Sequence, residues 1–110
     1  MAAKFELKKA PNGQYLFNLK AGNGEVILSS ELYEGKAGAR NGIDSVRKNA
    51  SDRDRYERKT SKDGRPFFLL IAANGQVIGR SEMYESMKAM ENGIASVTKN
   101  APKSRIEDLA

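Results

Sequence analysis

Two copies of a short segment carry the hydroxyl, carboxylate and phenol groups best suited to chemistry in this chain. They are Ser30, Glu31 and Tyr33 in the first copy, and Ser81, Glu82 and Tyr84 in the second. Each copy stands where a predicted strand gives way to a predicted helix, and functional sites favour such loops. Serine and glutamate there also serve as turn and capping groups, and a tyrosine ring can pack beneath a helix. We expect this structural role, with a ligand site shared by the two copies as the alternative.

Catalysis by these groups lacks a suitable base. A serine nucleophile needs a neighbouring group to remove its proton, but the chain has no histidine, and its lysines and carboxylates stand at no recognisable motif spacing. It has no cysteine either, which excludes disulfides, thiolate nucleophiles and thiolate metal ligands. No Walker loop, dinucleotide fingerprint or metal-binding loop is found in the sequence. The sequence therefore predicts a protein that is not an enzyme and that uses no cofactor and no metal.

Positive charge is the second lead. The formal net charge is +5, and a basic surface attracts nucleic acid through counterion release. Between positions 47 and 65, four acidic residues accompany eight basic ones, which are Arg47, Lys48, Arg53, Arg55, Arg58, Lys59, Lys62 and Arg65. Such interleaving also fits a solvated strand edge that is protected against aggregation. Few aromatic residues are available to stack on bases. Nucleic acid, or an acidic protein or other anion, is thus an alternative partner that we do not favour.

All these residues are positioned by a repeated unit. When residues 5–50 are paired with the residues 51 positions later, 22 of the 46 pairs are identical. Self-similarity of this kind indicates a repeat architecture, and an isolated unit of this size would bury too little surface to be stable. No linker rich in Gly, Ser or Pro separates the units. We predict one domain over residues 1–110, with repeat 1 at about 5–55 and repeat 2 at about 56–109 sharing one core.

Strands are predicted at the start of each unit, where apolar residues alternate or cluster in short runs between Asn-Gly or Asp-Gly turns. In repeat 1 the strands cover residues 5–8, 15–20 and 25–28, and in repeat 2 the corresponding runs include 66–71 and 76–79. The run 66–71 is apolar on both faces, so Phe67, Leu69 and Ile71 need a cover. Because a large exposed apolar patch usually marks an interaction site, a protein partner could bind at this sheet face or edge.

A change to spacings of three and four predicts a helix after the strands of each unit. In repeat 2, Ser86 is a good N-cap, and the apolar stripe comprises Met87, Met90, Ile94, Val97 and Ala101. In repeat 1, Gly35 occupies the cap position, and the stripe comprises Ala39, Ile43, Val46 and Ala50. Each repeat therefore contributes one helix to the core.

Three smaller features complete each unit. Gly42 and Gly93 lie inside the helices, which predicts close packing of the helix backbone on the sheet, with the approach of a ligand as the alternative. We predict that Asn49 and Asn100 adopt the left-handed conformation that ends a helix. Beyond each helix, Arg55–Glu57 and Arg105–Glu107 are consistent with a short strand.

The repeated motifs resemble those of the YegP-like family of small bacterial proteins. They are Ala21-Gly22-Asn23-Gly24-Glu25-Val26-Ile27, Ser30-Glu31-Leu32-Tyr33 and Asn41-Gly42-Ile43-Asp44-Ser45-Val46, together with their counterparts in repeat 2. The resemblance implies an α+β fold made from a tandem repeat of a β3-α-β unit. It further implies one continuous antiparallel sheet with two helices packed on it, and C-terminal strands exchanged between the repeats. Ile106–Leu109 would then pair with the first unit, and the segment near Tyr56 would serve both.

The resemblance implies no activity, because the family has no established biochemical function. Repeat 2 departs from the pattern by carrying Ile71 where repeat 1 has Lys20, and Met87 where it has Lys36. A site that needs those lysines could therefore exist only once.

Taken together, these features predict an uncharacterised protein-interaction or structural module. We expect a monomer that acts as an internal pseudo-dimer, with nucleic-acid binding through residues 47–65 as the alternative function. The sequence contains no run of about 20 apolar residues, so we expect no membrane association and a cytoplasmic location.

Overall fold

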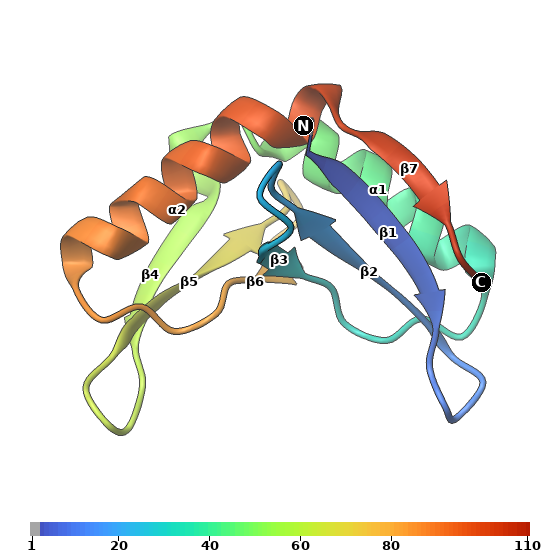
Figure 1. Ribbon diagram of the computed structural model, residues 1–110, viewed down its shortest axis with the longest axis horizontal. Helices are drawn as coiled ribbons and strands as arrows, with labels where there is room; N and C mark the ends of the chain where they lie inside the picture. The colour runs from blue at the N-terminus through green and yellow to red at the C-terminus, as the bar shows by residue number, and fades with distance from the viewer. Residues whose placement is uncertain (1–2) are drawn as a thin grey trace.

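The alternating apolar residues of each repeat form a three-stranded meander, and the helix-period segment that follows packs across it (Figure 1). The computed structural model describes residues 3–110. The strands are β1 (Lys4–Lys9), β2 (Tyr15–Lys20), β3 (Val26–Ser29), β4 (Tyr56–Thr60), β5 (Pro66–Ile71), β6 (Val77–Arg80) and β7 (Arg105–Asp108). The helices are α1 (Lys36–Asn49) and α2 (Met87–Asn100), with short 3-10 turns at Arg53–Arg55 and Ala101–Lys103. We call β1–β3 with α1 the first half and β4–β6 with α2 the second half.

The two halves join into one seven-stranded sheet in the order β4-β5-β6-β3-β2-β1-β7. They meet at the centre, where Ser29 of β3 faces Arg80 of β6 in an antiparallel bridge. At one edge, β7 of repeat 2 lies beside β1 of repeat 1. The continuous sheet and the crossing of the C-terminal strand into the first half are therefore as the resemblance implied.

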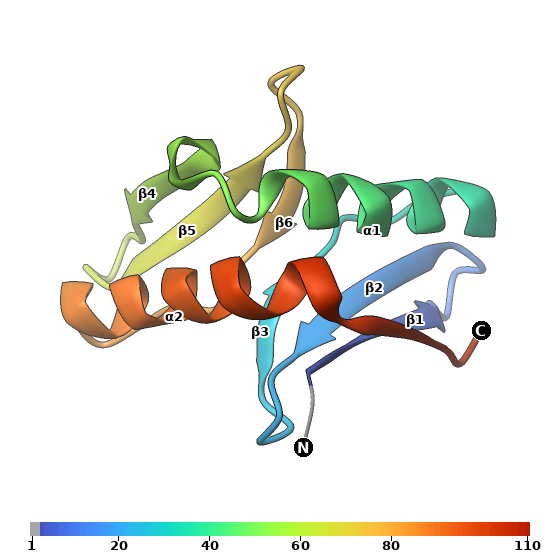
Figure 2. The same cartoon turned by 90° about the horizontal axis from the view of Figure 1, so that it is seen from above.

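The sheet differs from the implied arrangement at its two edges. β7 runs parallel to β1, whereas every other strand pair is antiparallel. The reason is the crossover connection through α2. After this helix, β7 begins beside the first residue of β1, so both strands run in the same direction (Figure 2). At the other edge, the segment near Tyr56 becomes β4, which follows α1 but pairs only with β5. Within residues 3–110, no strand lies on the outer side of β4.

Both helices lie side by side on one face of the sheet, as Figure 2 shows from above. The predicted stripes are fully buried at Ile43, Val46, Ile94 and Val97, and the core cluster unites residues from both halves. Met87 is a correction, because 57% of its surface is exposed. Its counterpart in α1, Lys36, contacts Asp108 of β7, whereas no strand formed by residues 3–110 covers the corresponding place beside α2. Neither helix in the described chain is long and apolar enough to cross a membrane.

The prediction for the helix ends is wrong. Among the described residues, only glycines have positive φ, and they lie in the hairpin turns. The side-chain amide of Asn49 instead donates from Nδ2 to the Ser45 carbonyl at 2.8 Å. The side-chain amide of Asn100 donates in the same way to the Ser96 carbonyl at 2.9 Å. Each asparagine side chain thus bonds to a carbonyl of its own helix. After both helices, the backbone stays in the right-handed conformation through the next residue, Ala50 or Ala101.

Candidate interaction surface

The serines of the two candidate loops fasten each loop to a strand. Ser30 Oγ accepts a hydrogen bond from the Phe17 amide at 2.9 Å and donates to the Glu31 carbonyl at 2.8 Å. Ser81 Oγ makes the same two bonds with the Phe68 amide and the Glu82 carbonyl, at the same distances. Each hydroxyl already uses its proton in a structural bond, so these serines hold the loop in place, as we expected.

The tyrosines of the loops support the helices. The Tyr33 ring stacks on Phe17 with centroids 6.2 Å apart, and the Tyr84 ring stacks on Phe68 at 6.3 Å. A Cβ added at Gly42 would collide with the Tyr33 hydroxyl, and one added at Gly93 would collide with that of Tyr84. The glycines therefore permit close packing, as predicted, although their partner is largely the loop tyrosine.

The environment of these two phenols raises their pKa values. Burial raises the pKa of both the Tyr33 and the Tyr84 phenol, and the nearby carboxylates of Glu31 and Glu82 raise it further. A phenol with a raised pKa holds its proton more firmly near neutral pH.

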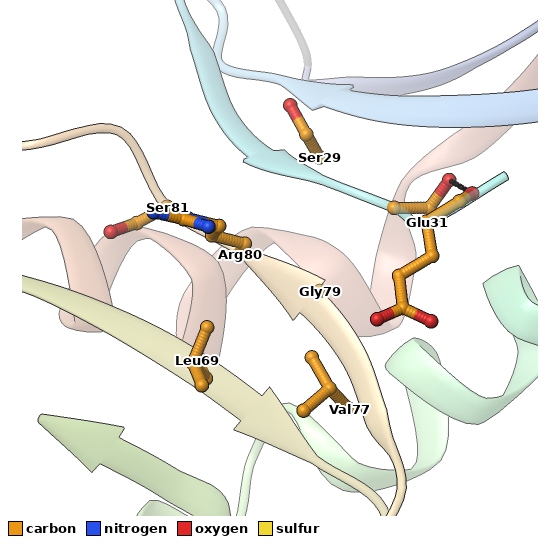
Figure 3. Close-up of a pocket in the computed structure, with 8 residues that line it drawn as sticks. Ser29, Glu31, Leu69, Val77, Gly79, Arg80 and Ser81 are labelled. Carbon is orange, nitrogen blue, oxygen red and sulfur yellow. Dashed lines mark hydrogen bonds between the residues drawn. The ribbon is translucent and has the colours of Figure 1, made fainter. Parts of the chain in front are cut away.

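A hollow of about 450 Å³ lies at the junction of the two halves, where β3 meets β6. Figure 3 shows side chains from β3, β5 and β6 around it, together with the loop that follows β3. Its lining comprises Ser29, Ser30, Glu31, Leu69, Val77, Gly79, Arg80 and Ser81. The structure thus brings three of the candidate loop residues, Ser30, Glu31 and Ser81, to one hollow. Glu82 and the two tyrosines do not line it.

On the second half, the sheet face away from the helices carries a group of apolar side chains, with Arg80 and the Glu57–Lys59 pair beside them. We call this side of the sheet the outer face. Leu69, Ile71 and Val77 are partly exposed and alternate along their strands with the core residues Phe68, Leu70 and Ile78, so they lie on this face. Both described helices lie on the other side of the sheet (Figure 1). Phe67 differs, because the Arg80 guanidinium lies over its ring at 4.8 Å and only 8% of the residue is exposed. The predicted need for a cover therefore applies to Leu69 and Ile71, but not to Phe67.

On the first half, the outer face carries an ion-pair cluster. The Glu6 carboxylate is buried and lies 3.1 Å from Lys20 and 3.5 Å from both Lys4 and Lys8. Burial raises the pKa of this carboxyl, but Lys20 and Lys8 more than offset that effect, so the pKa lies below its usual value. Ile71 occupies the position of Lys20 in the second half. The lysine unique to repeat 1 thus stabilises a buried charge that repeat 2 does not bury.

The eight basic residues between positions 47 and 65, which we call the basic segment, do not form one continuous cationic surface. Five of its eight basic side chains lie within 4 Å of a carboxylate, in the pairs Arg47–Asp44, Arg55–Asp52, Arg58–Glu91, Lys59–Glu57 and Arg65–Asp63. In the part of the chain that the structure describes, Lys48, Arg53 and Lys62 have no such partner. Arg58 turns toward α2, so its strand neighbours Glu57 and Lys59 point to the opposite face. The segment therefore divides its charge between two faces.

Sequence reasoning missed the residues that hold β7. Asp108 of β7 lies 2.8 Å from Lys36 and 3.0 Å from Arg40 of α1. Farther along α1, Arg47 donates to the Ser104 carbonyl at 2.5 Å and lies over the Phe5 ring. The sequence signal was the difference between the repeats, because the corresponding positions of α2 hold Met87, Glu91 and Thr98.

Comparison with known proteins gives relatives that are similar over nearly the whole of this chain. A family model described as "Domain of unknown function (DUF1508)" matches residues 10–57 and again residues 61–108. A UPF0339 protein of Bordetella pertussis is 57% identical, with 98% of this chain and 96% of the relative covered.

Two solution NMR structures are also similar. That of a UPF0339 protein from Shewanella oneidensis has a TM-score of 0.93 and 52% identity, with 99% of this chain and 92% of that chain covered. That of yegP from E. coli, named as a protein of unknown function, has a TM-score of 0.93 and 50% identity, with 99% and 94% covered.

Proposed function

This chain belongs to the DUF1508 family of YegP-like proteins, whose relatives are uncharacterised, and we propose that it is a non-enzymatic protein-interaction module. The outer face of the second half is the contact surface. The observation that carries this proposal is the group of partly exposed apolar side chains, Leu69, Ile71 and Val77, beside a hollow of about 450 Å³.

The composition of this surface suits a protein partner. Interaction sites commonly combine an apolar centre with a polar rim that forms hydrogen bonds. Here Leu69 and Val77 supply the apolar centre, and Ser29, Glu31 and Arg80 stand around it. A partner would place apolar side chains in the hollow and polar groups at its rim.

The same side chains give little support to an enzyme. The serines of the loops are engaged in structural hydrogen bonds, and the loop phenols have raised pKa values. These contacts support a binding role over a catalytic one.

Exchange of residues between the repeats provides the test. The variant Leu69→Asn with Ile71→Lys gives the second half the outer-face residues of the first, Asn18 and Lys20. We expect wild-type protein to retain a specific partner in quantitative affinity capture, and purified partner to bind it in calorimetry. The double variant should lose that binding, because its surface loses the apolar centre. Asn18→Ser, at the corresponding position of the first half, is the matched control and should keep it.

Partner binding that survives in Leu69→Asn with Ile71→Lys would contradict the proposal, since the proposed contact surface would then play no part. So would loss of binding in Asn18→Ser to the same extent, because that change leaves the apolar centre intact.

Nucleic-acid binding through residues 47–65 is the alternative function. Only Lys48, Arg53 and Lys62 of its eight basic residues lack a carboxylate partner in the described chain, which weakens it. Fluorescence titration with single- and double-stranded oligonucleotides at low and high salt tests this alternative. Affinity that falls steeply with salt would support it, because phosphate contacts release counterions.

A further inference from the structure

A second hollow, of about 510 Å³, lies on the outer face of the first half. Lys4 and Glu6 of β1, Lys20 of β2 and Arg105 of β7 line it, together with the β2–β3 turn at residues 21–24. A volume of this size is typical of small-molecule sites. Side chains from three strands thus surround a space large enough for a small ligand.

Three of the lining side chains are cations that stand in one row across the sheet. Lys4 faces Lys20 in the antiparallel pair with β2, and it faces Arg105 in the parallel pair with β7. Both lysines project to the outer face, because Phe5 and Leu19 beside them are fully buried in the core. Like charges that face one another on neighbouring strands repel. The row therefore needs negative charge beside it.

Two carboxylates offset this positive charge only in part. Glu6 lies within 3.5 Å of Lys4, Lys8 and Lys20, and Glu107 lies within 3.6 Å of Lys4 and Arg105. Four cations thus accompany two carboxylates, which leaves an excess of two positive charges.

The excess charge is accessible from the hollow. The side chains of Lys4 and Lys20 are each 27% exposed, whereas that of Glu6 is 7% exposed. Glu25, which follows the turn, has its carboxylate near Tyr84, a residue that packs against α2 on the other side of the sheet. A ligand that enters the hollow therefore meets ammonium groups before it meets a carboxylate.

The corresponding hollow of the second half has the opposite balance of charge. It measures about 300 Å³, and its lining of Asp54, Arg55, Tyr56, Glu57 and Ile71 includes one cation and two carboxylates. Ile71 stands in the place of Lys20. Within residues 3–110, no strand lies beyond β4 to supply a counterpart of Arg105. The cationic hollow is thus a property of the first half alone.

We propose that the cationic hollow of the first half binds the phosphate group of a small organic phosphomonoester. Such a group carries nearly two negative charges near neutral pH, which matches the excess. Lys4, Lys20 and Arg105 donate charge-assisted hydrogen bonds to its oxygens. The organic part lies along the turn at residues 21–24, since the hollow has room for more than a phosphate. The hollow shares no residue with the contact surface of the second half, so the two proposals fail independently.

The test is an NMR titration of the full-length protein with glycerol 3-phosphate, inorganic phosphate and acetate. It is carried out at about pH 8, where both phosphates are dianions, and at constant ionic strength, so that screening is the same for every probe. We expect both phosphates to shift the amides of residues 22–24 in a saturable manner at millimolar concentrations. The ester should bind at least as tightly as inorganic phosphate, and acetate should leave these amides unchanged.

Arg105→Gln is the variant that removes one contact and keeps the fold. Arg105 is largely exposed, and Glu107 retains Lys4 as a partner. The variant should weaken binding of the ester by about threefold, because one ion pair with the phosphate is lost. Lys62→Gln is the matched control, because it removes the same charge from the β4–β5 turn, and it should leave the affinity unchanged.

Several results would overturn the proposal. One is the lack of a saturable shift at residues 22–24 with either phosphate, and another is equal binding of acetate. Equal weakening in Arg105→Gln and Lys62→Gln would show only an effect of net charge. Tighter binding of inorganic phosphate than of the ester would exclude the organic ligand. Tighter binding of an oligonucleotide without a terminal phosphate, at the same amides, would make a nucleic-acid backbone the occupant instead.

Discussion

The two halves of this molecule agree in their cores and differ at their surfaces. Ile43 and Val46 of α1 have the identical counterparts Ile94 and Val97 in α2, and all four are fully buried. By contrast, within residues 3–110 β7 lies beside one edge of the sheet and no strand lies beside the other. The outer face of the first half buries the Glu6 carboxylate among lysines, whereas that of the second half carries partly exposed apolar side chains beside an exposed Glu57–Lys59 pair. The shared core requires the two halves to remain alike, whereas their edges and outer faces are free to serve different purposes.

The centre of the sheet shows that even the core is not fully symmetric. Leu28 of β3 corresponds to Gly79 of β6, and the two positions lie close together where the halves meet. A Cβ added to Gly79 would lie 2.6 Å from Leu28 Cγ. Only one member of this pair can therefore be large. Two identical units could not pack here in the same way.

The largest expected effect tests the likeness of the cores. Ile43→Ala and Ile94→Ala should each lower the free energy of unfolding by about 2–5 kcal/mol, because both side chains are fully buried. Denaturant titration of the full chain measures both. A loss at one position well below this range would show that its helix contributes less to the core than its counterpart does.

A smaller effect tests the asymmetry at the centre. Gly79→Ala should lower the free energy of unfolding by about 1–3 kcal/mol, because the added methyl group forces Leu28 to move. In a Leu28→Ala background the same change should cost much less, since the space is then free. A double-mutant cycle by denaturant titration gives the coupling between the two positions. Additive effects would mean that the two side chains do not compete for this space.

Most of the fold could be predicted from the sequence, because it depends on local patterns that occur twice. The turns at Asn12-Gly13 and Asn23-Gly24, the helix that follows Ser86 and the late strand at Arg105 all lie as expected. The structural role of Ser30 and Ser81 was also expected from their place between strand and helix.

The remaining features depend on contacts between distant segments. Met87 fits the apolar stripe of α2 by spacing, but it is exposed because no strand of the described residues lies beyond β4. The left-handed conformation predicted at the helix ends was wrong, because an asparagine such as Asn49 can either adopt that conformation or bond through its side chain to its own helix. Phe67 was expected to need an external cover, which Arg80 supplies from β6. In each case, the spacing of apolar residues predicts the helix or strand correctly but does not predict which other segments pack against it.

A still smaller effect concerns the attachment of β7. The ammonium of Lys36 is the main cause that holds the pKa of the Asp108 carboxyl below its usual value. A group whose pKa is lower in the folded state stabilises the fold above its unfolded pKa, and this contribution is lost as the pH falls through the folded value. We therefore expect the hydrogen-exchange protection factor of the Leu109 amide to fall as the pH drops below about 4.

In Asp108→Asn, the protection of the Leu109 amide should already be reduced at neutral pH and should change less on acidification. The same acid dependence in this variant and in the wild-type protein would show that Asp108 does not fasten β7.

The most direct test of the difference between the halves compares two corresponding amides in one sample. Leu7 of β1 faces β7, and Arg58 of β4 faces the open edge. Hydrogen exchange of the full chain near neutral pH, followed by NMR, should show strong protection of the Leu7 amide and exchange of the Arg58 amide close to its unstructured rate. Equal protection of the two amides would contradict the account, because the outer edge of β4 would then be closed as well.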